Sequence, residues 1–273
     1  MYPEYYNIPA SELSEGTLVP FLVMQDSGEI HYEIAYQMFK EVEKNNALNR
    51  KTVMICPCGP VNQYPIFARL VNNTKTSLKN TWIINMDEYI TEEGDLIDKN
   101  DPLSFRGCMQ RYLYDRIDPD IIMPEHQRIF PDPHHPEKIG QLIEKLGGVD
   151  LAIGGVAVNG HIAFNDPIPE MSNEEFKNLP TRVVTLSLTT RLKDAILNRG
   201  GAIDSLPERA VTIGMKEILG AKKIILTMMN NMQRAVIRCA THGKVTSACP
   251  VTFIQEHPDA QLIVSENVTE LPF

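Results

Sequence analysis

Two groups of acid–base side chains in the sequence are suited to moving protons on a small organic substrate. The first group is the pair Asp87–Glu88. The second is a glycine-rich segment in which Asn159, His161 and Asp166 fall within eight residues. An imidazole titrates near neutral pH and a nearby carboxylate fixes its tautomer, so His161 with Asp166 is a natural acid–base pair. These residue types predict proton-transfer chemistry.

Both groups follow short apolar segments that are typical of buried strands. Residues 81–85 (TWIIN) precede Asp87, and residues 150–154 (DLAIG) lead into the glycine-rich segment. A carboxylate at the end of a strand, walled by apolar residues, can have its pKa raised toward a value useful for proton abstraction. Adjacent acids at a strand end can equally be solvated or cap the next helix. Taken alone, the Asp87–Glu88 pair leaves both interpretations open.

Strand-like and helix-like segments alternate along most of the chain. The predicted strands are residues 52–56, 81–85, 150–154, 182–186, 223–227 and 261–264, and the predicted helices are 29–45, 64–71, 102–116, 137–146, 207–219 and 233–240. Such alternation favours parallel strands with crossover helices. We therefore predict an α/β fold, a three-layer α/β/α domain with a mostly parallel, doubly wound, Rossmann-like sheet. Ligands bind such sheets beyond the carboxyl ends of the strands.

We expect one domain over residues 1–273, because no linker or repeat divides the chain. Residues 1–20 have no clear periodicity and have Pro at positions 3, 9 and 20, which predicts an extended N-terminal arm. This segment carries acids and no Lys or Arg before residue 17, unlike a secretory signal. With no signal, the five scattered cysteines are expected to be reduced thiols in the cytoplasm.

The composition disfavours several partners and cofactors. The chain has 26 Lys plus Arg against 35 Asp plus Glu, and a net charge of −9 disfavours binding to nucleic acid. No apolar segment approaches the about 20 residues of a membrane-spanning helix, so no membrane partner is expected. Cys56 and Cys58 are too close for a zinc knuckle, and no second pair has ligand spacing. We predict no metal site.

The two acid–base groups lie in motifs that resemble the two signatures of the glucosamine-6-phosphate deaminase family. These motifs are residues 85–89 (NMDEY) and residues 154–165 (GGVAVNGHIAFN). Residues 185–191, 210–214 and 253–258 also match in order, so the resemblance covers about residues 56–264. The related 6-phosphogluconolactonases share the implied fold, but they typically follow the Gly-His with Thr-Ala-Ser. The Ile-Ala-Phe-Asn of this chain favours the amino-sugar branch.

The resemblance implies a role for each acid–base residue. Asp87 is implied to be the base that moves a proton between C2 and C1 of the ring-opened sugar, with Glu88 organising the site. His161 is implied to open the pyranose ring, oriented by Asn159 and Asp166. The family usually has Glu at this position. The side chain of Asp166 is one methylene shorter than that of Glu, so its carboxylate is expected to reach His161 only if the loop shifts. The implied reaction releases ammonia from an imine and needs no metal or organic cofactor.

The segment that corresponds to the family's phosphate loop departs from the family pattern. The family loop reads roughly Thr/Ser-Gly-Gly-Thr/Ser-Pro, and its amides and hydroxyls hold the phosphate. Residues 58–62 here read CGPVN, and Pro60 has no N–H to donate. A hand-made alignment places Ile196 and Gln233 where the family has a phosphate-binding Arg and Lys. We therefore expect that recognition of the 6-phosphate is altered or lost.

The predicted substrate-binding residues come from the two glycine-containing loops and one cation. They are Cys58, Gly59, Gly155, Gly160 and Arg191. The leading hypothesis is an amino-sugar deaminase or aldose–ketose isomerase that acts on a sugar or sugar phosphate. The alternatives are a sugar-lactone hydrolase and a non-catalytic sugar-binding relative, although a pure binder needs neither a base nor a ring-opening group. The resemblance also implies a homo-oligomer.

Overall fold

The computed structural model describes residues 2–17 and 19–273, which form two β-sheets of different construction. The larger sheet has seven parallel strands in the order β1–β10–β9–β6–β2–β3–β5. These strands are β1 (Phe21–Met24), β2 (Thr52–Cys56), β3 (Thr81–Asn85), β5 (Arg128–Ile129), β6 (Leu151–Gly155), β9 (Lys223–Met228) and β10 (Ala260–Ser265). The smaller sheet is antiparallel, with the order β4 (Asp87–Ile90), β8 (Arg209–Thr212) and β7 (Arg182–Thr185).

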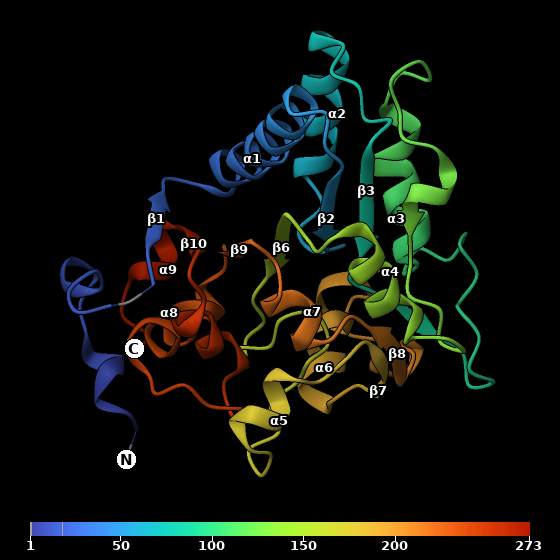
Figure 1. Ribbon diagram of the computed structural model, residues 1–273. Coiled ribbons are helices and arrows are strands. Elements are labelled where there is room, and N and C mark those ends of the chain that lie inside the picture. Colours follow the sequence, from blue (N-terminus) through green and yellow to red (C-terminus); the bar gives the residue numbers. More distant parts are fainter. Residues whose placement is uncertain (1, 18) are drawn as a thin grey trace.

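Helices cover both faces of the larger sheet (Figure 1). One face is covered by α1 (Ser27–Ala47), α2 (Gln63–Thr74) and α3 (Phe105–Tyr112), and the other by α4 (Lys138–Leu146), α7 (Met215–Leu219), α8 (Arg234–His242) and α9 (Glu266–Thr269). Two further helices, α5 (Asn173–Lys177) and α6 (Leu188–Asn198), lie toward the smaller sheet. The predicted three-layer, doubly wound α/β fold is confirmed. Among the described residues, no helix combines the length and apolar character that crossing a membrane requires.

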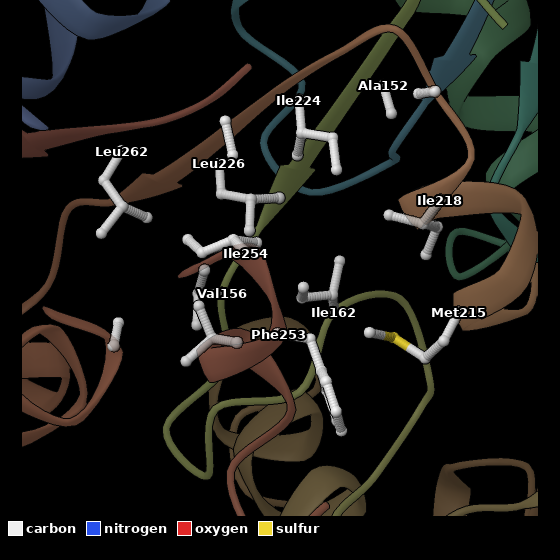
Figure 2. Packing of buried hydrophobic residues seen from close by; sticks show 14 of the residues in the cluster. Ala152, Val156, Ile162, Met215, Ile218, Ile224, Leu226, Phe253, Ile254 and Leu262 are labelled. Carbon is white, nitrogen blue, oxygen red and sulfur yellow. The ribbon is translucent and has the colours of Figure 1, made fainter. Parts of the chain in front are cut away.

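The core is divided by the larger sheet because side chains alternate between its two faces. In β2, Val53 and Ile55 belong to one buried cluster, while Met54 and Cys56 belong to the other. Figure 2 shows part of the first cluster, in which Phe253 and other side chains from outside the sheet pack against strand residues. Burial on both faces explains why β2 and β3 are nearly continuous apolar segments in the sequence.

The order of the strands reverses between β2 and β6. From β2 the chain proceeds through β3 to β5 at one edge, and it then returns to β6 and continues through β9 to β10. Loops that leave two neighbouring strands in opposite directions create a crevice beyond the carboxyl ends of those strands. Residues 57–62 follow β2 and residues 156–167 follow β6. The topology therefore brings the two glycine-containing loops to one place.

The helix predicted over residues 207–219 is wrong. Residues Arg209–Thr212 form strand β8, and a helix starts only at Met215, after Gly214. The strand predicted at 182–186 does form, as β7, but it belongs to the antiparallel sheet. Both differences arise because β8 pairs with β4 on one side and with β7 on the other. Tertiary pairing decides the structure of such short segments.

The N-terminal arm is not extended as predicted. Residues Glu4–Asn7 and Ala10–Glu12 form 3₁₀ turns that begin after Pro3 and Pro9, while positions 1 and 18 of the predicted arm lie outside the described residues. The arm is attached to α8, since Arg238 Nε donates to the Ile8 carbonyl at 2.9 Å. The segment from Glu4 to Ile8 thus packs against α8.

Candidate active site

A cavity of about 330 Å³ opens at the reversal point between β2 and β6. Its walls come from the loops that follow β2, β3, β6 and β9, and from α6. Asp87 and His161, which are far apart in the sequence, both line this cavity. Cys58, Gly59 and Gly155 line it as well. The structure therefore brings most of the residues predicted for the site together.

Asp87 is held at the junction between the two sheets. Its predecessor Met86 donates its N–H to the Cys56 carbonyl at 3.0 Å and accepts from the Ile213 N–H at 2.6 Å. Asp87 itself begins β4 and pairs with Thr212 of β8. These backbone contacts fix the position from which the carboxylate faces the cavity.

The Asp87 carboxyl group is buried and has no hydrogen-bond partner among the described residues. Burial raises its pKa well above the usual value for Asp, and repulsion from Glu88 and Asp194 adds to this effect. Lys193 acts in the opposite direction. A carboxyl group with a raised pKa and free oxygens is suited to take and return a proton.

His161 ends a tight turn that follows β6. The Ala157 N–H donates to the His161 carbonyl at 3.1 Å, and the Gly160 N–H donates to the Ala157 carbonyl at 3.0 Å. Gly160 has a φ of +82°, in the left-handed region that favours glycine. An ideal Cβ on Gly160 would lie 2.7 Å from Cys249 Sγ, so glycine is also needed for space. Gly160 shapes the turn, and it does not line the cavity.

Asp166 orients the His161 ring. Its Oδ1 lies 2.7 Å from His161 Nδ1 and accepts from Thr190 Oγ1 and Asn159 Nδ2, both at 2.8 Å. Its Oδ2 accepts from the Ser187 N–H at 3.2 Å. Burial opposes ionisation, but the hydrogen bond and charge of His161, with the other donors, lower the pKa of Asp166 below its usual range. An ionised Asp166 requires a proton on Nδ1, which leaves Nε2 of the ring for a substrate.

Asp166 reaches His161 although its side chain is shorter than the Glu that the family usually has. The carboxylate reaches the imidazole at hydrogen-bond distance although it lacks the methylene of Glu. Asn159 contributes twice, since its amide donates to Asp166 and its carbonyl oxygen accepts from the His161 N–H at 3.3 Å. The predicted orienting residues are therefore in contact with His161 as a group.

Glu88 is fully buried and faces the start of α3 rather than the cavity. Its carboxylate accepts the backbone N–H groups of Tyr89, Phe105 and Arg106 at 3.0, 3.0 and 2.9 Å, and the Ser104 hydroxyl at 2.8 Å. Burial raises the pKa of Glu88, while these hydrogen bonds oppose the shift. Glu88 thus joins the start of α3 to β4.

The predicted glycines Gly59 and Gly155 mark the closest approach of two loops. An ideal Cβ on Gly155 would lie 2.7 Å from the Gly59 carbonyl oxygen, so no side chain fits at this position. Cys58 lines the cavity beside them, with its Sγ 3.7 Å from the Phe105 carbonyl oxygen. Burial raises the pKa of the Cys58 thiol well above its usual value. Cys58 is therefore a thiol rather than a thiolate.

The prediction that Arg191 binds the substrate is not supported by its position, because Arg191 does not line the cavity. Its guanidinium contacts Glu208 at 3.0 Å, and Ile196 of the same helix is 61% exposed. Arg234 also faces away and pairs with Glu270. Among the described residues, Lys193 is the single Lys or Arg that lines the cavity.

Lys193 is already paired with a carboxylate of the same cavity. Its Nζ lies 2.7 Å from Asp194 Oδ1, and the Tyr89 hydroxyl donates to Asp194 Oδ2 at 2.9 Å. Tyr89, Thr190 and Asp194 were not among the predicted site residues. The sequence does contain a signal for α6, because Ser187 is a helix-capping residue that accepts from the Thr190 N–H at 3.2 Å.

Gln233 lines the cavity, but its amide is used within the protein. Its Oε1 accepts the N–H groups of Met229 and Asn230 at 2.7 and 2.8 Å. Its Nε2 donates to the Val156 carbonyl. Gln233 therefore connects the loop after β9 to the loop after β6 and presents no charge to a ligand.

Comparison with known proteins identifies relatives over most of the chain, although no family model matches it. A glucosamine-6-phosphate deaminase of Clostridium beijerinckii is 28% identical over 252 residues, which cover 90% of this chain and 97% of the relative. A glucosamine-6-phosphate deaminase of Bacillus pumilus is 29% identical over 218 residues, covering 78% and 83% respectively. The similarity thus includes both loops of the cavity.

Solved structures show the same fold. A monomeric glucosamine-6-phosphate deaminase superimposes with a TM-score of 0.79 and 24% identity, covering 92% of this chain and 98% of the other. A 6-phosphogluconolactonase from Trypanosoma cruzi gives a TM-score of 0.66 with 14% identity, covering 92% and 95%.

Proposed function

Because the chain belongs to the glucosamine-6-phosphate deaminase family, we propose that it is an amino-sugar deaminase and aldose–ketose isomerase. The observation that carries this proposal is the contrast among its three site carboxyl groups. Glu88 and Asp166 are occupied by hydrogen bonds, whereas Asp87 is buried, unpartnered and directed to the cavity that also holds His161. Asp87 is the group that is free to act as a base.

In the proposed reaction, His161 first opens the sugar ring. Ring opening removes the proton from the C1 hydroxyl and adds one to the ring oxygen, and Nε2 of an imidazole anchored through Nδ1 can transfer it. Asp87 then takes the proton from C2, which gives an enolamine, and returns it to C1. The resulting C2 imine is hydrolysed to a ketose and ammonia. The residues present perform these steps as acids and bases.

We propose further that recognition of a 6-phosphate is weakened. The cations expected for a phosphate are replaced or already paired, since Gln233 is neutral, Lys193 is paired with Asp194 and Arg191 with Glu208. Pro60 removes one backbone donor from the loop after β2. A hydrogen bond to a charged group contributes about 1.5–3 kcal/mol, so two lost contacts weaken phosphate binding by about 3–6 kcal/mol. The favoured substrate is an amino sugar without a dianionic group at C6.

Ammonia release over a small panel of sugars tests both parts of this proposal. The panel contains glucosamine, galactosamine and their 6-phosphates, and ketose formation is followed in parallel. We expect a higher kcat/KM for at least one free amino sugar than for its phosphate ester. Efficient turnover of the ester at micromolar concentration would reject the weakened phosphate site. Hydrolysis of 6-phosphogluconolactone, with neither ammonia nor ketose formed from any amino sugar, would reject the deaminase in favour of a lactonase.

The remaining expectations stay predictions. They are a single domain over residues 1–273, a homo-oligomer and a cytoplasmic location. Scattering and limited proteolysis of the purified chain address the first two directly.

A further inference from the structure

A second cavity, of about 600 Å³, lies on the other side of the turn that carries His161. Ala157 and His161 line the first cavity, while Val158 and Asn159 line the second, so the turn separates them. The two cavities have no lining residue in common. The second cavity has no part in the proposed reaction, yet it contacts Asn159, a residue that orients His161.

Two free cysteines line this second cavity. Cys239 lies on α8, and Cys249 immediately precedes the 3₁₀ helix Pro250–Glu256. The two thiols interact closely enough that each shifts the pKa of the other. The Tyr5 hydroxyl donates to the Cys239 sulfur at 3.6 Å. Both cysteines line the cavity, through which a small oxidant can approach them.

The two elements that carry these cysteines are tied together. Gln255, in the 3₁₀ helix, donates through Nε2 to the carbonyls of Ala240 and Gly243 at 3.0 and 2.9 Å. Both carbonyls belong to the end of α8 and the residue after it. These contacts between a side chain and the backbone hold the two cysteine-bearing elements together.

The contacts of Cys239 make it the more reactive of the two. Interaction with the Cys249 thiol, together with the hydrogen bond from Tyr5, outweighs burial and lowers the pKa of Cys239 to about 7. The same interaction with Cys239, together with burial, raises the pKa of Cys249. Because the thiolate is the nucleophilic form of cysteine, Cys239 is available to react at neutral pH while Cys249 keeps its proton.

We propose that Cys239 and Cys249 form a peroxide-sensitive dithiol that closes into a disulfide beside the catalytic turn. The Cys239 thiolate attacks one oxygen of hydrogen peroxide, breaks the O–O bond and becomes a sulfenic acid, and the hydroxide leaving group takes up a proton. Cys249 then attacks the sulfenic sulfur and displaces water, which leaves the disulfide. In total, two thiols lose two electrons and two protons, and one peroxide becomes two water molecules.

The position of Cys249 links this oxidation to His161. Its Sγ occupies the space beside Gly160, where an ideal Cβ would come within 2.7 Å. Val251 strengthens the connection, because its N–H donates to the Gly160 carbonyl at 2.8 Å. A disulfide requires an S–S separation of about 2.05 Å, so the Cys249 sulfur moves toward Cys239 on oxidation. This movement changes the packing under the turn and displaces His161 from its orientation.

Peptide mapping of the intact protein after peroxide treatment tests the dithiol directly. We expect a cross-linked peptide pair containing Cys239 and Cys249, reversed by dithiothreitol. In Cys249→Ser the reaction stops at a sulfenic acid on Cys239, trapped by dimedone, and Cys239→Ser forms neither product. Cys108→Ser is the matched control and retains the cross-link. Full alkylation of both Cys239 and Cys249 in peroxide-treated wild type overturns the proposal, and this result needs no variant to fold.

The link to His161 has its own readout. We expect the imidazole NMR signals of His161 to shift when the wild type is oxidised and to return on reduction, with no peroxide-dependent shift in Cys239→Ser. Unchanged His161 signals in a fully cross-linked protein overturn the link. Because neither measurement uses an amino sugar, this proposal fails or succeeds independently of the proposed reaction.

Discussion

The residues around the first cavity fall into two sets that use their polar groups in opposite ways. Near His161, the Asp87 carboxylate has no hydrogen-bond partner in the part of the chain that the structure describes. Around Gln233 and Pro60, the Gln233 amide hydrogen-bonds to the protein backbone. No unpaired Lys or Arg among the described residues lines this part of the cavity. Under the proposed function, the first set would transfer protons and the second would no longer hold an anion.

A second contrast lies within the acid–base set itself. Burial raises the pKa of Asp87, whereas the His161-led hydrogen bonds lower the pKa of Asp166 although burial opposes them. In the proposed mechanism, the same type of side chain is a proton acceptor in one position and an anion in the other. Environment, rather than residue type, separates the two roles.

The largest effect should come from Asp87→Asn. Removal of a general base typically costs about 10²–10⁴-fold in rate, so we expect kcat for the preferred amino sugar to fall by this factor while binding is retained. Steady-state kinetics and calorimetric titration measure the two quantities. Asp204→Asn, at an exposed position outside the cavity, is the matched control. Unchanged turnover in the Asp87 variant would exclude the proposed mechanism.

The same variant has an opposite effect on stability. The raised pKa of Asp87 means that, above the unfolded value of about 3.9, the unfolded chain loses this proton before the folded chain does. The free energy of unfolding therefore falls as pH rises from the unfolded pKa of Asp87 to its raised folded pKa. We expect Asp87→Asn to be more stable than wild type at pH about 7 and equal to it near pH about 4, as measured by urea unfolding. A less stable variant at neutral pH contradicts the raised pKa.

Asp166→Asn should have a smaller effect on rate and the reverse effect on stability. Loss of a carboxylate that orients a histidine typically costs about 10–100-fold, and we expect kcat to fall by this amount. Since the folded pKa is lowered, the carboxylate stabilises the protein above the unfolded value and this contribution is lost as pH falls. The variant should lose about 1.5–3 kcal/mol at neutral pH. A destabilisation that does not shrink in acid would argue against an ionised Asp166.

Gln233→Ala tests the other set of residues and should have the smallest effect on chemistry. It leaves the N–H groups of Met229 and Asn230 without their acceptor, which should cost about 1–3 kcal/mol in the free energy of unfolding. We expect kcat for a free amino sugar to change little. Gln110→Ala removes an exposed amide and is the control. Equal stability losses in the two variants would show that Gln233 is not a structural connector.

The parallel core could be predicted from the sequence because its strands are apolar and bounded by turns. Strands β2 and β3 begin and end at the predicted residues. Their continuous hydrophobicity reflects burial on both faces, which is a property of the segment itself. Asp87 and His161 could be placed near each other for the same reason, since both follow such strands.

The smaller sheet and its contribution to the site could not be predicted in this way. Strand β4 contains Asp87 and Glu88, whose burial depends on β8 and on the start of α3. The local sequence of residues 87–90 and 209–212 does not predict the pairing of β4 with β8. The sequence does not indicate Lys193 and Asp194 as cavity residues because their positions depend on where α6 packs. It indicates Arg191 by charge alone, whereas the structure pairs Arg191 with Glu208.

The junction at Met86 has a consequence for how this site could change over evolutionary time. The base begins the first strand of the small sheet, so its reach into the cavity depends on the alignment of that strand with Arg209–Thr212. An insertion or deletion between β7 and β8 could therefore retune which carbon atom the carboxylate addresses, while the seven-stranded scaffold stays intact. Divergence of substrate choice among proteins of this architecture can then begin in a segment far downstream of the proposed base.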